Sequence, residues 1–330
     1  MKKRYWIGGA TAVAAGGALA LKLLTRPGDV EWEEHRGRLH HAEKSRFVEI
    51  EGVRVHYQEA GERGAPAVLL IHGFCASNFV WNESLVPLAE AGFRVIAPDL
   101  MGFGFSGKPR EGHYTIETQA RMICGLMDAL GVERAAFVGS SYGGAISAVC
   151  ALDHASRVER LVLVGSVSND EIVRRPLLRF AATPLVGELV APVLLDVRQF
   201  VKQRLRTTYA AQNGHLLSDV RVAAHRLPLR AAATHRAILR TIRGWSATRI
   251  EREAGRIRQP TLLVWGAEDD AVPLHHGERL HELIKDSRLF VFPNCGHLPQ
   301  EERPREFAAL VAEFCRNGEA FADAAKARKE

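Results

Sequence analysis

Ser141 lies in a pattern of small residues that suits a nucleophile. The segment Gly139-Ser140-Ser141-Tyr142-Gly143 has the form G-x-S-x-G; the apolar run Ala135–Val138 precedes it, and a stretch of helical spacing, Ser141–Leu152, overlaps it. A sharp turn from strand to helix exposes the central hydroxyl, and it leaves no room for a Cβ at the first and last glycine. The pattern predicts that Ser141 attacks from the carboxyl end of a strand.

His297 is the predicted general base. A serine hydroxyl is a poor nucleophile near neutral pH unless a base lies within hydrogen-bond reach. His297 comes five residues after the apolar run Arg288–Phe292. Because the carboxyl ends of parallel strands meet at one edge of a sheet, we expect the imidazole to lie beside Ser141 and to take its proton.

An acidic side chain must orient that imidazole and stabilise its charged form. The apolar run Thr261–Trp265 is followed by Glu268, Asp269 and Asp270, so the acids reach the same edge of the sheet. Asp269 is the predicted partner of His297. Asp270 and Glu268 remain alternatives.

The tetrahedral intermediate also needs hydrogen-bond donors for its oxyanion. The loop Ile71-His72-Gly73-Phe74 ends one apolar run, and Tyr142 follows the serine. The backbone amides of Phe74 and Tyr142 are the predicted pair. His72 is expected to support this loop rather than to take part in the chemistry.

Short apolar or alternating runs that are typical of strands recur along the chain, and helical patterns separate several of them. Alternating strands and helices favour a mostly parallel sheet with helices on both faces. The predicted strands are Arg46–Glu51, Val53–Glu59, Ala67–Ile71, Arg94–Ala97, Ala135–Val138, Arg160–Val164, Thr261–Trp265 and Arg288–Phe292, and the clearest helices are Thr115–Leu130, Ser141–Leu152 and Pro304–Cys315.

Residues 167–259 interrupt this alternation with helical patterns alone. They carry 17 Lys and Arg against 7 Asp and Glu, a net charge of +10, while the remainder of the chain carries −4. A basic and apolar segment suits an anionic lipid surface, although a solvated arginine-rich surface explains the same composition. The segment lacks a nucleic-acid-binding motif, so we expect no nucleic-acid partner.

The first 24 residues have the pattern of an export signal or a membrane anchor. Met1-Lys2-Lys3-Arg4 is basic, and the next 17 residues are uncharged and rich in Ala and Gly. The pattern predicts that the body of the protein lies on the periplasmic or extracellular side. A packed or disordered N-terminal helix is the alternative. Residues 317–330 form a polar tail.

The composition is that of a globular protein. The chain has 330 residues, of which 47% are hydrophobic and 25% are charged, with a formal net charge of +6. These values exclude a disordered chain, a collagen and a polytopic membrane protein. The five cysteines form no C-x-x-C pair, which argues against a disulfide framework and a structural zinc site.

In this order and spacing, the motifs resemble those of the α/β-hydrolase superfamily over roughly residues 47–316. The resemblance implies an eight-stranded, mostly parallel sheet with a helical cap after strand six, and no cofactor or metal. It divides the chain into a core over 46–166 and 260–316 and a basic cap over 167–259. The segments that carry it are His72-Gly73-Phe74, Asp99-Leu100-Met101-Gly102-Phe103-Gly104-Phe105-Ser106, Gly139–Gly143, Gly266–Asp269 and Gly296-His297.

Within this superfamily, the serine argues against haloalkane dehalogenases and epoxide hydrolases, which use an aspartate nucleophile. Carbon–carbon bond hydrolases of ring-cleavage products share the serine triad, often with a tryptophan soon after the histidine. Here the segment is His297-Leu298-Pro299-Gln300-Glu301, without that tryptophan. The N-terminal segment is similar to that of bacterial lipases and membrane-associated hydrolases of the monoacylglycerol-lipase type.

We therefore expect a serine esterase or lipase that acts on a small-molecule or lipid ester through an acyl-enzyme on Ser141. Another hydrolase with the same triad, acting on a carbon–carbon bond or a lactone, or a perhydrolase, is the first alternative. A non-catalytic binding protein on a hydrolase scaffold is the second. Tyr142 departs from the Met or Gln that is more usual after the nucleophile, and its ring is expected to narrow the acyl pocket.

Overall fold

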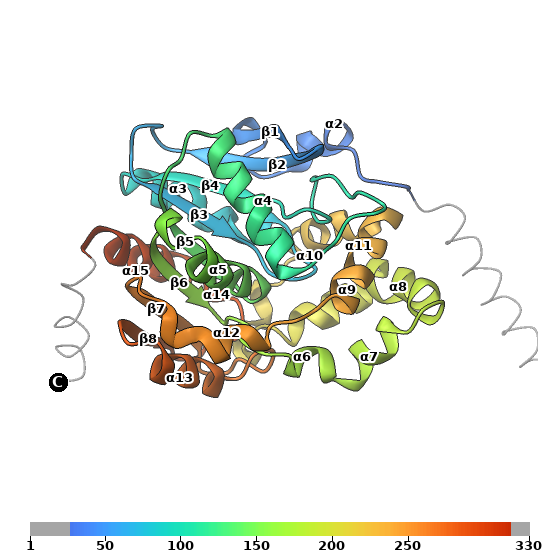
Figure 1. The fold of residues 1–330 in the computed structure, drawn as a ribbon. Helices are drawn as coiled ribbons and strands as arrows, with labels where there is room; N and C mark the ends of the chain where they lie inside the picture. Colours follow the sequence, from blue (N-terminus) through green and yellow to red (C-terminus); the bar gives the residue numbers. More distant parts are fainter. Residues whose placement is uncertain (1–26, 318–330) are drawn as a thin grey trace, which may run out of the picture.

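The computed structural model describes residues 27–317, which build an open eight-stranded sheet (Figure 1). The strand order is β1-β2-β4-β3-β5-β6-β7-β8. The strands are β1 Ser45–Ile50, β2 Val53–Ala60, β3 Ala67–Ile71, β4 Arg94–Pro98, β5 Ala135–Ser140, β6 Val158–Val164, β7 Thr261–Gly266 and β8 Ser287–Phe292. The predicted eight-stranded, mostly parallel sheet is confirmed. Strand β2 pairs antiparallel with both β1 and β4, and all the other neighbouring strands pair in parallel.

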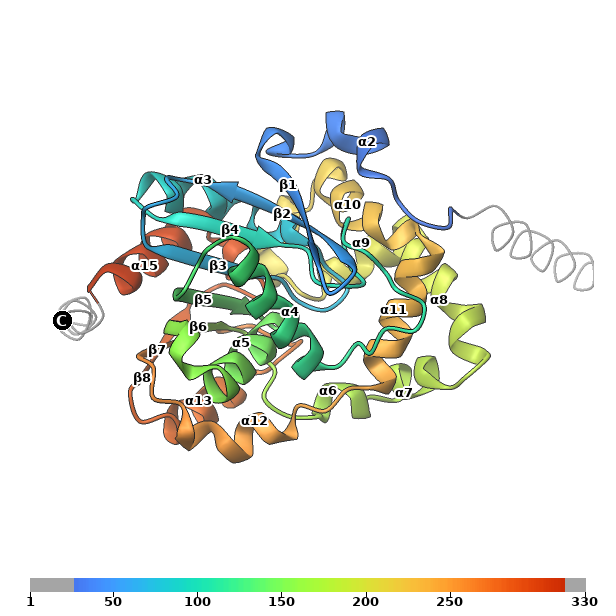
Figure 2. The same cartoon turned by 45° about the horizontal axis from the view of Figure 1, so that its top comes forward.

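Helices cover both faces of the sheet because alternate residues of its central strands point to opposite sides. In β3, Leu69 and Ile71 face a core shared with α4 (Ile116–Ala129) and α5 (Tyr142–Asp153). Val68 and Leu70 face a second core, shared with α3 (Asn82–Glu90) and α15 (Pro304–Asn317). Figure 2 shows the sheet between these layers.

The ends of α4 lie where the sequence pattern predicts them. The hydroxyl of Thr115 accepts a hydrogen bond from the amide of Thr118 and so caps the first turn. After the helix, Gly131 has a positive φ of 65°, a conformation that glycine adopts without strain.

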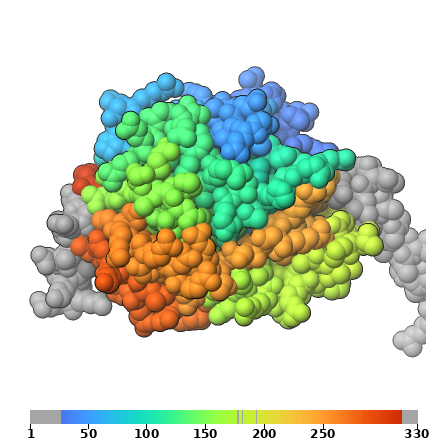
Figure 3. Space-filling model, viewed as in Figure 1, coloured from blue at the N-terminus to red at the C-terminus, as the bar shows by residue number. Residues whose placement is uncertain are grey.

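Seven α-helices form the cap between β6 and β7, as the resemblance implies. In Figure 3 the yellow-green and orange parts of this cap pack side by side beneath the core. The cap helices are α6 Glu171–Arg174, α7 Pro176–Ala182, α8 Val186–Asp196, α9 Arg198–Arg206, α10 Asp219–Arg226, α11 Ala232–Arg243 and α12 Thr248–Glu253. After β7 come α13 Leu274–Leu283 and the short α14 Pro299–Glu302.

The register of the parallel strands brings their carboxyl ends to one edge of the sheet. Ile71 of β3 pairs with Gly139 of β5, and Ser140 of β5 pairs with Val164 of β6. The loops that leave these strands therefore emerge next to one another, under the cap.

The predicted signal or anchor over residues 1–24 lies outside the described residues, and so does all but the first residue of the predicted tail. The first described helix is α2, Trp32–His35. Within residues 27–317, the structure contains no helix of the length and apolarity that crossing a bilayer requires.

Candidate active site

Ser141 stands on a strained turn between β5 and α5. Its φ of 55° and ψ of −114° are unusual for a residue with a side chain, and it is the residue before the first turn of α5. Two backbone hydrogen bonds hold the turn: the amide of Ser141 donates to Val164 at 2.8 Å, and its carbonyl accepts from Val167 at 3.2 Å. This conformation presents the hydroxyl at the sheet edge.

The two glycines that flank the serine are required by close packing, as predicted. A Cβ on Gly143 would lie 2.1 Å from the carbonyl oxygen of Ile71, and a Cβ on Gly139 would lie 2.3 Å from that of Gly143. Contacts this short are forbidden for carbon. Any larger residue would push α5 away from the sheet and move the hydroxyl.

His297 and Asp269 form a buried hydrogen-bonded pair. The distance from His297 Nδ1 to Asp269 Oδ2 is 2.8 Å. The amides of Ala271 and Val272 donate to the other carboxylate oxygen, Asp269 Oδ1, at 2.9 and 2.8 Å. Because the carboxylate accepts at Nδ1, that nitrogen carries the proton, and Nε2 is left to receive one.

Of the three acids that the sequence offers, Asp269 is the one that hydrogen-bonds His297. Asp270 and Glu268 are exposed, and Glu268 accepts instead from Gln212 of the cap at 2.8 Å. The turn after β7 decides this choice, because its amides point at residue 269.

Two acids that the sequence analysis did not single out fasten the His297 loop to the cap. Glu302 accepts hydrogen bonds from the amides of Gly296 and Ala210, each at 2.9 Å, and from Asn213 Nδ2 at 2.7 Å. In addition, the amide of His297 donates to the carbonyl of Thr208 at 2.6 Å. The only signal in the sequence was a pair of acids just after the histidine.

The neighbouring Glu301 is buried in a cluster with cap residues. It accepts from Tyr209 Oη, lies 3.1 Å from His225 Nε2 and also pairs with Arg221. Burial raises the pKa of Glu301, but the charge and hydrogen bond of His225 and the hydrogen bond of Tyr209 outweigh it. The pKa is therefore held below its ordinary value of 4.5, and the side chain is a carboxylate.

The amides of Phe74 and Tyr142 are both available to a ligand, since neither donates to another described residue. Phe74 lines the same cavity as Ser141, and a Cβ on the adjoining Gly73 would lie 3.8 Å from Ser141 Oγ. Their function as an oxyanion pair remains a prediction. The ring of Tyr142 is buried against Trp245, with 4.9 Å between ring centroids, and is absent from the described walls of that cavity.

His72 supports the loop, as predicted. Its Nδ1 donates to the carbonyl of Gly73 at 2.8 Å, and its Nε2 accepts from the amide of Leu100 at 3.0 Å. Burial lowers the pKa of His72 and keeps the imidazole neutral, which this pair of hydrogen bonds requires.

A cavity of about 80 Å³ joins the serine, the histidine and the cap. Arg204 and Leu205 of α9 and His225 of α10 form its cap side. Arg204 Nη2 donates to the carbonyl of Cys75 at 3.5 Å, and burial raises the pKa of the Cys75 thiol to about 11, so this cysteine is a thiol at neutral pH.

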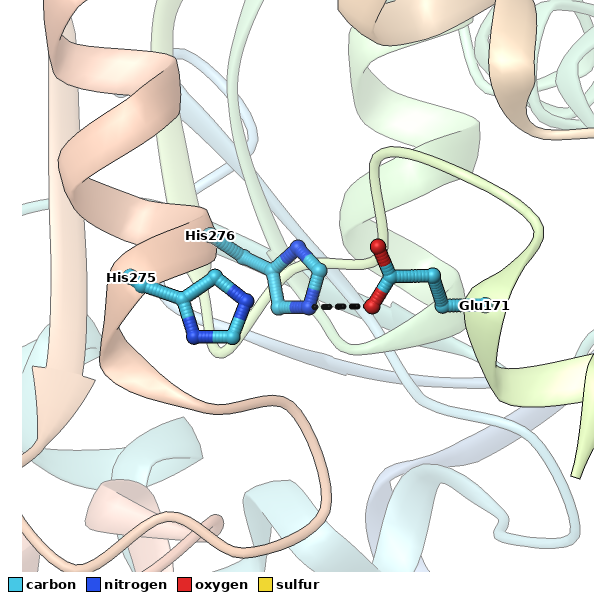
Figure 4. Close-up of side chains that lie close together, drawn as sticks. All are labelled: Glu171, His275 and His276. Carbon is cyan, nitrogen blue, oxygen red and sulfur yellow. Dashed lines mark ion pairs between the residues drawn. The ribbon is translucent and has the colours of Figure 1, made fainter.

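Three potential metal ligands lie at a different place, where α6 meets α13 (Figure 4). The ligand atoms of Glu171, His275 and His276 are within 4.8 Å of one another, and His276 Nε2 is 3.4 Å from Glu171 Oε2. Burial lowers the pKa of His276, so near neutral pH this contact joins the carboxylate to a neutral imidazole. The cluster joins the start of the cap to the core, and none of its members lines the Ser141 cavity.

A family model described as alpha/beta hydrolase fold matches residues 66–304. The chain belongs to this family. Its relatives include the 2-hydroxy-6-oxo-6-phenylhexa-2,4-dienoate hydrolase of Comamonas testosteroni, which is 32% identical over 278 residues, or 79% of this chain and 91% of that protein.

Two solved structures are also similar to this hydrolase. A meta-cleavage product hydrolase from Pseudomonas fluorescens is 28% identical with a TM-score of 0.65, and the match covers 82% of this chain and 96% of that one. A membrane phospholipase A, described as a bacterial virulence factor, is 27% identical with a TM-score of 0.69, and the match covers 96% of this chain and 99% of that one.

These comparisons correct the expected subfamily. The curated relative and the first structure are hydrolases of ring-cleavage products, rather than monoacylglycerol lipases. The broader statement, that the chain is an α/β-hydrolase, is the one that the comparisons support.

Proposed function

We propose that this hydrolase cleaves the carbon–carbon bond beside the ketone of an anionic 2-hydroxy-6-oxo-dienoate, through an acyl-enzyme on Ser141. The observation that carries the proposal is Arg204, the one Arg or Lys among the described side chains that line the Ser141 cavity. A half-buried guanidinium suits the carboxylate of such a substrate, since it can donate two parallel hydrogen bonds. Similarity to enzymes named for these substrates supports the same class.

In the proposed reaction each member of the triad has one role. The substrate first takes its 2-oxo form, and the hydroxyl proton moves to C5. Ser141 Oγ then attacks the C6 carbonyl carbon and passes its proton to His297 Nε2, while the amides of Phe74 and Tyr142 receive the oxyanion. Collapse breaks the C5–C6 bond, and the electron pair is delocalised to the 2-oxo group, which takes the proton from His297.

Water completes the reaction. His297 removes a proton from the water as it attacks the acyl carbon, and the proton then returns to Ser141 Oγ. Asp269 stabilises the imidazolium in both halves of the cycle. The products are a carboxylic acid and a 2-hydroxydienoate, which together account for the substrate and one water.

The proposal requires the cap to move. Pockets that hold ligands of this size usually have volumes of about 300–1,000 Å³, far above the 80 Å³ of this cavity. We infer that α9 and α10 shift when substrate enters.

The decisive experiment follows the loss of dienoate absorbance with purified enzyme and its Arg204→Gln variant. We expect the wild type to consume 2-hydroxy-6-oxo-6-phenylhexa-2,4-dienoate, and the variant to show at least a tenfold higher KM for it. The KM for neutral p-nitrophenyl acetate serves as the control and should change little. Turnover of esters without any turnover of the dienoate would reject the proposal.

Ester hydrolysis is the second candidate, and the phospholipase structure favours it. That match covers 96% of this chain against 82% for the ring-cleavage enzyme, so it includes N-terminal or C-terminal residues that the other does not. Together with the predicted anchor, this supports a lipid ester as substrate and a membrane-associated location. Release of fatty acid from phospholipid vesicles, with Ser141→Ala as the blank, tests it directly.

A further inference from the structure

A second cavity lies beside the active site and is not used by the proposed reaction. Its volume is about 340 Å³, and its walls come from the N-terminal residues 35–40, from β2, from the 3₁₀ turn Asn78–Trp81 and from α10 with the turn that follows it. We refer to it as the lateral cavity. It is about four times as large as the cavity at Ser141.

The wall charges of the lateral cavity are all of one sign. Arg38, Arg226 and Arg230 line it together with three histidines, and no Asp or Glu side chain does so among the described residues. Arg226 is bound to Asp196 at 2.9 Å. Arg38 and Arg230 are exposed and form no ion pair with any described residue, so their charges are free to attract an anion.

A buried histidine in the same wall has one nitrogen without a partner. His56 is 1% exposed, and its Nδ1 lies 2.7 Å from Asp99 Oδ2. Its Nε2 has no hydrogen-bond partner among the described residues. Leaving such a buried nitrogen without a partner is costly.

Asp99 sets the chemistry of that nitrogen. Its carboxylate also accepts the amides of Asn78 at 2.7 Å and Phe105 at 2.9 Å. Burial raises the pKa of Asp99, but the hydrogen bond and charge of His56 and the other donors lower it further, so the group is ionised. Because the carboxylate accepts at Nδ1, that nitrogen of His56 carries the proton and Nε2 is a hydrogen-bond acceptor, so the donors for an anion in this cavity are the arginines.

Much of the remaining wall of the lateral cavity is apolar, although four Asn, Gln and Ser side chains also line it. Leu39, Phe79 and Phe105 line it from the core side, and Val220 and Leu227 line it from the cap. A ligand that fills it must therefore combine an anionic head with an aliphatic body. A small inorganic anion would leave these side chains facing water.

The lateral cavity and the catalytic cavity share two structural elements, the 3₁₀ turn Asn78–Trp81 and α10. Val80 and His225 line the catalytic cavity, while their neighbours Phe79 and Ala224 line the lateral cavity. A ligand in one cavity thus packs against the same turn and the same helix, α10, as a ligand in the other.

We propose that the lateral cavity is a binding site for an aliphatic carboxylate, with Arg38 and Arg230 around the head group and the chain along the apolar wall. The site is distinct from the Ser141 cavity and does not depend on which bond the enzyme cleaves.

Isothermal titration of the full chain with octanoate tests this assignment. We expect one octanoate per chain at this site, and at least tenfold weaker binding when Arg38→Gln and Arg230→Gln are combined. Arg204→Gln is the matched control, because Arg204 lines the other cavity, and it should leave this affinity unchanged. Octanol should bind equally to the wild type and to the double variant.

Two results would overturn the proposal: unchanged octanoate affinity in the double variant, or a loss of affinity in Arg204→Gln instead. A crystal structure with octanoate gives an independent answer that does not rely on variants. The carboxylate is expected within hydrogen-bond distance of the Arg38 and Arg230 guanidinium groups. Octanoate bound only at Ser141 would contradict the assignment.

Discussion

At the scale of single residues, the candidate site depends on the orientation of one imidazole. His297 is held from three directions: Asp269 accepts from Nδ1, Thr208 accepts from its amide, and Glu302 binds the preceding amide. Each contact fixes a different degree of freedom of the side chain or its loop. The orientation of the imidazole, and with it the nitrogen left to receive a proton, is therefore determined before substrate arrives.

Removing the nucleophile tests the role of Ser141. We expect Ser141→Ala to lower kcat by at least about 10⁴-fold, because the acyl-enzyme cannot form. It should also abolish labelling by a fluorophosphonate probe. The buried Ser147 of the same helix donates to the carbonyl of Gly143, and Ser147→Ala is the control that should keep its labelling. Equal labelling of Ser141→Ala would mean that another residue is the nucleophile.

Exchanging each neighbouring acid for its amide tests which one orients His297. Asp269→Asn should lower kcat by about 10⁴-fold, since the amide favours the wrong imidazole tautomer. Asp270→Asn changes an exposed side chain, so its kcat should stay close to that of the wild type. The comparison is made by steady-state kinetics on one soluble substrate. A greater loss in Asp270→Asn would reassign the acid.

At the scale of elements, the turns that leave the parallel strands position the site. Gly165, after β6, has a φ of 48°, and a Cβ there would lie 2.9 Å from His297 Nδ1 and 3.0 Å from Asp269 Oδ2. This glycine was not singled out in the sequence, because it belongs to no motif. A glycine is required here because the loops after β7 and β8 place Asp269 and His297 against its backbone.

Gly165→Ala should therefore damage activity more than stability. We expect kcat to fall by about 10²-fold, which is typical of a misplacement of catalytic groups by about 1 Å. Gly131→Ala is the matched control: its φ is 65°, but no atom lies within 4 Å of the added Cβ. That variant should lose about 1 kcal/mol of stability and keep its kcat. Similar kcat values for Gly165→Ala and Gly131→Ala would show that contact of the added Cβ with His297 and Asp269 is unimportant.

The cap is fastened to α14 by buried charges, and this makes stability depend on pH. The pKa of Glu301 is lower in the folded protein than in the unfolded chain. Its carboxylate therefore contributes fully to the free energy of unfolding above pH 4.5, the ordinary pKa, and this contribution is lost as the pH falls through the pKa of the folded state. Glu301→Gln should cost about 3–5 kcal/mol at pH 7, since His225 loses its carboxylate partner and Arg221 keeps only Glu83. Denaturant unfolding between pH 7 and pH 3 should show a shallower decline for the variant. Parallel curves would contradict this role.

At the scale of the whole molecule, the basic cap is partly neutralised by the acidic core. Arg221 pairs with Glu83 and Glu301, and Arg249 pairs with Asp153 across the boundary between cap and core. Charge of opposite sign thus holds the two parts together. The outer cap keeps apolar side chains in contact with solvent, with Phe180 at 55% exposed and Leu185 at 79%.

The proposed location is tested by removing residues 1–24. We expect the shortened chain to move from the membrane fraction to the soluble fraction and to retain its kcat on a soluble substrate, because the core and cap begin later. If the shortened chain stays with membranes, the apolar and arginine-rich cap surface is the binding element. Loss of activity on soluble substrates would mean that the segment belongs to the fold.

The sequence alone determined the features that depend on neighbours in the chain. These features are the glycines around Ser141, the apolar runs of the strands and the capped end of α4. They follow from local sterics, burial and hydrogen bonding, and each can be recognised from a few consecutive residues. Tertiary structure alone decided which acid meets His297, that Glu301 and Glu302 bind the cap, and that His56 faces a basic cavity beside Asp99. These contacts join residues far apart in the chain, and their partners are set by strand register and loop direction, which local spacing does not encode.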